Sequence, residues 1–193
     1  MARLSYVKEN NNTGLIRLGI VRGEESVSYT VDKAFYTKLG RPERGCILDD
    51  GTVSLIAEED GKIEAKKSAL SLLSYSDNNE KGLYMKLRRK GYDSATARNA
   101  VDEMVSLGYV NEERQLLRII KSEANDKLRG PKKILPALVS KGYPIGLVRS
   151  VMRRLCDDRE VDFQANAARL VNKRLGSGAD PKEAKELLYK SGF

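Results

Sequence analysis

Clusters of basic side chains are the residues of this chain whose types and spacing best suit a chemical role. Arg88, Arg89 and Lys90 are consecutive, and Arg118 and Lys121 are three apart, so the latter pair would share one helix face. Such strips bind phosphate or carboxylate groups. The candidate binding residues are Arg88, Arg89, Lys90, Arg118, Lys121, Lys132, Lys133, Lys141, Arg149, Arg153 and Arg154. The alternative is a solvated surface, and cations also favour the negative end of a helix dipole.

Side chains that support catalysis or metal binding are scarce. Histidine is absent, which removes the commonest general base and the commonest metal ligand. Cys46 and Cys156 are the only cysteines, and they are too far apart in sequence to indicate a disulfide framework or a zinc site. We expect both to be small residues that are buried or half-buried. No glycine-rich phosphate loop is present. The sequence therefore predicts a protein that is not an enzyme, without cofactor or metal.

The positive charge is unevenly distributed along the 193 residues. Residues 1–60 hold 8 basic and 10 acidic side chains, a net of −2, whereas residues 61–193 hold 27 and 17, a net of +10. A basic region attracts polyanions, which means nucleic acid or an acidic protein surface. The open alternative is a basic surface that serves only solubility. No apolar run is long enough for a signal peptide or a membrane span, so we expect a cytosolic protein without membrane contact. We also expect a monomer.

The elements that must position these cations begin with a β-rich segment. Residues 4–7, 15–21 and 26–31 alternate apolar and polar side chains, which predicts three strands. Asp32 can cap a short helix over residues 33–39. Residues 46–57 are predicted to form a hairpin around Asp50-Gly51, or else a loose extended segment. The acidic run at 58–61 marks the expected boundary of a small N-terminal region, residues 1–60.

From about Lys62 an internal repeat replaces the strand pattern. Gly91, Gly142 and Gly192 are 51 and 50 residues apart, and each closes a predicted helix. Twelve residues before each glycine stands a residue suited to begin that helix, namely Asn79, Gly130 or Asp180. Pro131 and Pro181 then occupy the first helical position, where a missing N–H costs nothing. Pro136 should kink or loosen the second of these helices.

Each repeat contains more than this one helix. A first helix is expected at 63–73, 112–128 and 163–175, and a third begins near Asp93 or Ser94 and near Pro144. The predicted fold is mainly α, with tandem three-helix repeats in an elongated array behind a small β-rich region. The repeats span about 61–109, 110–158 and 159–193. The last lacks its third helix, so either it is shortened or its open face is covered by something else.

The repeats resemble the RecX family. In that family a KL..KG segment leads to L...G.LDD..FA and then to G...I...L..KG. The segments that carry the resemblance are Leu83–Tyr92, Leu107–Arg114, Arg129–Ile134 and Leu138–Tyr143, and the pattern extends over residues 62–193. The N-terminal part, around Tyr29–Gly40, is similar to the small β extension of some members. The sequence departs from the pattern at three places: Asn111-Glu112 replaces the acidic pair, Gln115-Leu116 replaces Phe-Ala, and Gly82 replaces a carboxylate.

The resemblance implies a regulator of the recombinase RecA. Family members bind RecA and its filament on single-stranded DNA, and they inhibit its recombinase, ATPase and co-protease activities in DNA repair. The partners expected here are therefore RecA and the RecA filament, with weak direct DNA binding in addition. The rival hypotheses are a nucleic-acid-binding helical repeat protein that does not depend on RecA, and an adaptor for another acidic protein.

The middle repeat should have the most fixed geometry, because it has neighbours on both sides. Replacing Arg118, Lys121, Lys132 and Lys133 together by Ala is therefore predicted to weaken filament binding without loss of helix. Replacing Lys8, Lys33 and Lys38 should do much less, since the first segment is not net basic.

Overall fold

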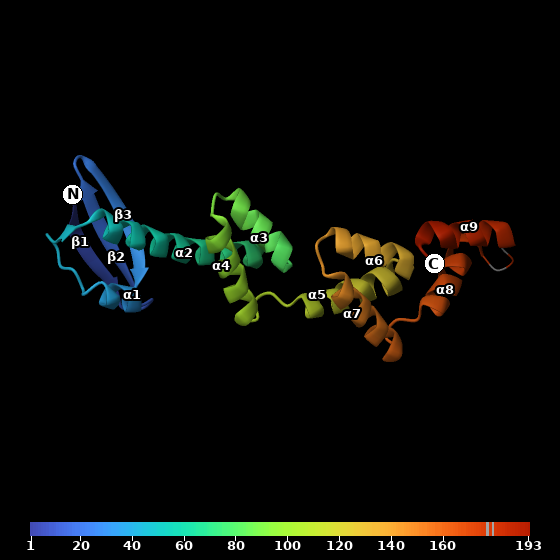
Figure 1. Cartoon of the computed structure of the whole chain (residues 1–193). Helices are drawn as coiled ribbons and strands as arrows, with labels where there is room; N and C mark the ends of the chain where they lie inside the picture. The colour runs from blue at the N-terminus through green and yellow to red at the C-terminus, as the bar shows by residue number, and fades with distance from the viewer. Residues whose placement is uncertain (177, 179) are drawn as a thin grey trace. The chain divides into compact units, whose positions relative to one another are not determined.

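The computed structural model describes residues 1–176, 178 and 180–193, and it divides the chain into two compact units. The first unit comprises residues 1–75 and 84–106, and the second comprises residues 76–83 and 107–193. Each unit contains a hydrophobic core of its own. Figure 1 shows strands only near the N-terminus and helices along the rest of the chain.

The first unit begins with a four-stranded antiparallel sheet. β1 (Ala2–Asn10), β2 (Leu15–Arg22), β3 (Glu25–Asp32) and β4 (Ile47–Leu48) are arranged in the order β3-β2-β1-β4. Alternation places Ile16, Leu18 and Ile20 on one face, where they are buried together with residues of α1 (Lys33–Lys38) and α2 (Asp50–Tyr75). The three strands predicted from alternation are confirmed, and so is the cap, because the Asp32 carboxylate accepts the backbone N–H of Phe35 at 2.6 Å.

The predicted hairpin at residues 46–57 is wrong. Only Ile47–Leu48 form a strand, and α2 begins at Asp50 and continues to Tyr75, through the acidic run at 58–61. The reason is capping: the Asp49 carboxylate accepts hydrogen bonds from the backbone N–H of Thr52 at 2.7 Å and from its hydroxyl at 3.1 Å. Asp50-Gly51 is therefore the first turn of a helix rather than a strand-to-strand turn, and Ile56 is fully buried against the sheet.

Helices make up the rest of the chain. The first repeat contains the end of α2, then α3 (Glu80–Arg89) and α4 (Ser94–Ser106). The second contains α5 (Glu112–Lys121), the π-helical turn η1 (Ser122–Asp126), α6 (Pro131–Ser140) and α7 (Ile145–Asp157). The third contains α8 (Phe163–Leu175) and α9 (Pro181–Ser191). No strand occurs in residues 79–155, and the mainly helical fold behind a small N-terminal sheet is confirmed. α6 continues through Pro136 to Ser140. The helix predicted at 112–128 is α-helical only from Glu112 to Lys121, and the π-helical turn η1 follows it.

The second unit has its core in the middle repeat. Apolar residues spaced three and four apart on α5, α6 and α7 are buried together, as the repeat pattern predicted. The principal members are Leu116, Ile120, Ile134, Leu138, Tyr143, Val148, Val151 and Leu155. The separation of the chain into residues 1–60 and three repeats stays a prediction.

Both cysteines are exposed, so the expectation that they are buried or half-buried is wrong. Cys156 follows the buried Leu155 on α7 and thus lies on the outward side of that helix. Desolvation by the surrounding atoms and the charges of Asp157 and Asp162 raise the pKa of its thiol. None of the described helices is both long and apolar enough to cross a bilayer. The described residues also contain no group of three or more acidic or cysteine side chains placed to hold a metal ion.

Candidate functional site

Two junctions within the second unit join the start of one helix to the end of another. The Asn79 side chain caps α3 by accepting the N–H of Gly82 at 2.8 Å, and its amide nitrogen donates to the Lys141 carbonyl at 3.0 Å. At the next junction the Gly130 N–H donates to the Ser191 carbonyl at 2.8 Å. The beginning of a second helix thus contacts the end of the second helix in the following repeat. Asn79 and Gly130 are the residues whose spacing defined the repeat.

The glycines of these junctions permit a close approach of backbones. A Cβ atom added at Gly130 would overlap the carbonyl group of Gly192, and one added at Gly192 would overlap the backbone of Lys133. Gly192 also has a φ of +87°, in the left-handed region. Gly192 therefore meets two needs, a left-handed turn and close contact with the start of α6. The sequence pattern indicated only the first.

A buried polar network supports the first of these junctions. Gln115 donates from Nε2 to the Asn78 carbonyl at 3.1 Å, and the Tyr143 hydroxyl donates to Gln115 Oε1 at 2.9 Å. Glu112 Oε1 accepts the Glu80 N–H at 3.0 Å. Burial raises the pKa of the Glu112 carboxyl, and burial with the nearby charge of Glu112 raises the pKa of the Tyr143 hydroxyl. Gln115, which departs from the family pattern, thus connects the Asn78 carbonyl to the Tyr143 hydroxyl.

Six of the eleven candidate cations are engaged within their own unit. Ion pairs join Arg118 to Asp77, Lys121 to Glu160 and Arg154 to Glu113. Three others donate to backbone carbonyls: Arg88 to Tyr92 at 2.6 Å, Lys132 to Phe193 at 3.1 Å, and Lys133 to Lys190 at 3.1 Å. Except for the local contact of Arg88, each of these contacts joins different helices or the segments between them. We call the six the engaged cations.

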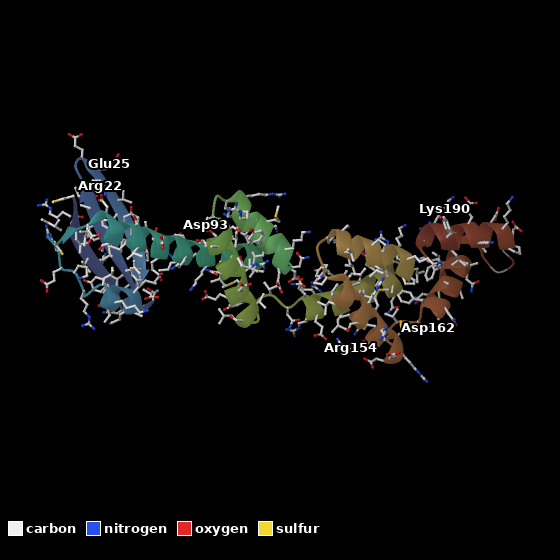
Figure 2. All side chains as sticks on the ribbon, viewed as in Figure 1. Arg22, Glu25, Asp93, Arg154, Asp162 and Lys190 are labelled. Carbon is white, nitrogen blue, oxygen red and sulfur yellow. The ribbon has the colours of Figure 1, made fainter. Side chains whose placement is uncertain are left out.

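The other five candidates are exposed and have no ion pair or side-chain hydrogen bond within the described part of the chain. These free cations are Arg89, Lys90, Lys141, Arg149 and Arg153. Arg149 and Arg153 are one turn apart on the outward side of α7, in the same helix as the engaged Arg154 that Figure 2 labels. Their guanidinium groups are available to an anionic partner.

One further cation that the sequence analysis missed lies at a cavity of about 430 Å³ in the second unit. Arg114 lines this cavity with the engaged Arg118, and Tyr109 beside them is 59% exposed. Arg114 has no ion pair in the described residues. Its spacing could have revealed it, because Arg114 and Arg118 are four residues apart on α5 and share a face.

The amino-acid sequence is similar to that of regulatory protein RecX from several bacteria. The family model described as the first three-helix domain of RecX matches residues 65–104. The regulatory protein RecX of Oceanobacillus iheyensis is 22% identical over 187 residues, which cover 97% of this chain and 67% of the relative. That of Clostridium tetani is 27% identical over 142 residues, covering 74% and 63%. That of a Clostridium perfringens strain is 30% identical over 121 residues, covering 62% and 55%.

Solved structures agree in fold. A crystal structure of regulatory protein RecX matches with a TM-score of 0.74 at 17% identity, covering 100% of this chain and 95% of the other. RecX from Lactobacillus salivarius matches with a TM-score of 0.58 at 22% identity, covering 69% and 89%. The resemblance to RecX that the sequence motifs predicted is therefore confirmed in sequence and in fold. The chain spans from 55% to 67% of the three relatives' lengths.

Proposed function

We propose that this RecX-like chain is a regulatory protein, not an enzyme, that binds RecA and the RecA filament on single-stranded DNA and inhibits RecA activity. The observation that carries the proposal is the RecX likeness, which extends over 97% of the chain in sequence with one relative and over 100% in fold with one structure. RecA as the partner is what this resemblance implies.

The free cations supply the chemistry for such a partner. A protein filament on DNA presents phosphates and carboxylates together, and unpaired guanidinium and ammonium groups bind both. The engaged cations are already partnered, so using them for binding would first break contacts between helices. Binding through the free cations should weaken as salt rises, because bound phosphates release counterions.

The direct test is RecA's DNA-dependent ATP hydrolysis. The purified chain, added at sub-stoichiometric to equimolar ratios, should slow hydrolysis, and RecA should retain it in a pull-down without DNA. An unchanged ATPase rate together with failure of the pull-down would contradict the proposal. If the chain then still bound single-stranded DNA, the RecA-independent nucleic-acid protein would be the better explanation.

Two matched quadruple variants locate the interface. One replaces the free Arg89, Lys90, Arg149 and Arg153 by Ala, and the other replaces the engaged Arg118, Lys121, Lys132 and Lys133. Each removes four positive charges. The first should weaken filament binding and leave the thermal unfolding midpoint nearly unchanged, whereas the second should lower the midpoint. Greater loss of filament binding in the second variant, at unchanged stability, would show that the engaged cations make the contact.

A further inference from the structure

Among the described residues, the hydrophobic core packs on one face of the N-terminal sheet, and the side chains of the other face point away from it. Ile16, Leu18 and Ile20 point to the core, so the alternate residues of β2 point outward, and their partners in β1 and β3 follow the same alternation. A register shift at Ser5 moves the alternation of β1 by one residue, so that Tyr6 and Lys8 lie on the same face as their partners Gly19 and Arg17. The exposed residues of this outer sheet face are Arg3, Tyr6, Lys8, Arg17, Ser26 and Ser28.

Two cations are directly opposed on the outer sheet face. Lys8 of β1 is the register partner of Arg17 of β2, and on the other side Arg17 is opposite Thr30 of β3. Like charges directly opposite each other repel, so this arrangement opposes folding unless an anion lies between them. Within the described residues neither Lys8 nor Arg17 has an ion pair. The pair is thus a site of uncompensated positive charge.

The acidic residues of this region are occupied elsewhere. Glu9 also lines the groove described below, but its carboxylate is already paired with Lys33 at 2.6 Å. Asp32 caps α1, and Asp60 of α2 accepts the Thr30 N–H at 2.6 Å along the edge of the sheet. The net charge of −2 in residues 1–60 therefore conceals a face on which positive charge is concentrated.

A groove of about 670 Å³ includes the Lys8–Arg17 pair. It is also lined by Thr30, by Lys67 of α2, by Asn10 at the end of β1, and by Asn11 and Asn12 of the loop that follows. Amide side chains both donate and accept hydrogen bonds, which suits base edges and sugar hydroxyls as well as phosphates. The groove lies wholly within the first unit.

Tyr6 adds an aromatic surface next to the cations. Its ring covers Gly19, where a Cβ atom would overlap the ring, and its hydroxyl is bonded to the Ser28 hydroxyl at 2.9 Å. The ring is thereby held in place while Tyr6 remains 37% exposed. A fixed, exposed aromatic ring beside unpaired cations is the combination that binds single strands, because bases stack on the ring while phosphates meet the charges.

We propose that the outer sheet face binds single-stranded nucleic acid, with phosphates at Lys8 and Arg17 and a base on the Tyr6 ring. An acidic protein would account for the cations but not for the exposed ring. The proposal does not rest on RecA, since it concerns nucleic acid bound by the chain alone.

The test of the charges is fluorescence anisotropy of a labelled oligothymidylate with the full chain in the absence of RecA. The double variant Lys8→Ala, Arg17→Ala should bind more weakly, and the slope of log affinity against log salt should fall by about 1.4, because each lost phosphate contact removes roughly 0.7. The matched control is Lys38→Ala with Arg44→Ala, two exposed cations outside this face. Equal binding by both variants would overturn the proposal. So would a loss confined to the RecA filament, which would assign the face to a protein partner.

The test of the ring uses a single tryptophan, because the chain has none of its own. Tyr6→Trp should show fluorescence quenching when oligothymidylate is added, since stacked bases quench indole emission. Tyr75→Trp is the control, because Tyr75 is 89% exposed in the same unit but outside the sheet. Quenching at position 6 and not at position 75 is the expected result. Absence of quenching at position 6, with oligothymidylate bound, would overturn the stacking role.

Discussion

The N-terminal sheet and the repeats of the second unit use their cations differently. On the sheet, Lys8 and Arg17 are opposed, and neither has an ion pair within the described residues. In the second unit, Arg118, Lys121 and Arg154 pair with carboxylates, and Lys132 and Lys133 donate to carbonyls of the third repeat. The segment with negative net charge therefore presents unpaired cations, while the basic segment uses many of its cations to join helices.

This difference shows why net charge is a weak guide to an interface. Charge counts treat all cations alike, but only an unpaired cation is available to a partner without cost. Strand alternation separates side chains onto two faces, so acids and bases of one segment can be kept apart. Helical repeats instead bring acids and bases from different helices together. The following predictions test this contrast between a free face and a packed junction.

The largest effect is expected from adding a methyl group at two glycines. Gly130→Ala would force its Cβ into the Gly192 backbone, which cannot move without opening the junction, and should cost about 2–3 kcal/mol. Gly19→Ala would instead meet the Tyr6 ring and the Ser5 side chain, and the ring can move only when its exposed hydrogen bond to Ser28 breaks, so the cost should be smaller than that of moving backbone. Urea unfolding of the two variants measures this. Equal losses would mean that the sheet face is as tightly packed as the junction.

The next largest difference in stability is expected between two variants that each lose one tyrosine hydroxyl. Tyr143→Phe leaves the buried Gln115 Oε1 without its donor and should cost about 1–2 kcal/mol. Tyr6→Phe removes an exposed bond to Ser28, which water can replace, and should cost less than about 0.5 kcal/mol. The free energy of unfolding at neutral pH is the measurement. A larger loss of unfolding free energy in Tyr6→Phe than in Tyr143→Phe would mean that the sheet, and not the junction, is the tightly packed region.

The pH dependence of Glu112→Gln examines the junction alone. Because burial raises the folded-state pKa of Glu112, the folded chain takes up this proton at a pH where the unfolded chain does not. This contribution to stability is complete below the unfolded pKa and is lost as pH rises through the folded pKa. The variant should therefore unfold at a higher temperature than the wild type at neutral pH. The difference should shrink below about pH 4.5, the ordinary value. A difference that grew on acidification would contradict the burial of Glu112.

The smallest effects should have opposite signs. Arg118→Ala removes an exposed ion pair with Asp77 and should lower stability by about 0.2–1 kcal/mol. Arg17→Ala relieves the repulsion with Lys8 and should raise stability by a similar amount, about 0.2–1 kcal/mol. Both differences should diminish at high salt, since both are electrostatic. Destabilisation by Arg17→Ala would indicate that Arg17 makes contacts that hold the sheet together.

Local sequence signals predicted the structure best where a residue type or spacing is compatible with only one backbone conformation. Gly91, Gly142 and Gly192 have positive φ, as their place at helix ends predicted, and alternation located the first three strands. The signal failed at Asp50-Gly51, because Asp-Gly suits a turn as well as the first turn of a helix. The Asp49 cap and the burial of Ile56 decided between the two.

By itself the sequence determined the repeat, its helices and the likeness to RecX, because helix periodicity and helix ends are set by neighbouring residues. It also determined the total charge. Which cations are free was decided by the tertiary structure, since Arg118 and Asp77, or Lys132 and Phe193, come together only when the second unit folds. The outer sheet face was likewise decided by folding, because pairing of β1 with β2 sets Lys8 opposite Arg17. Contacts between residues far apart in sequence depend on packing of whole elements, which no local pattern specifies.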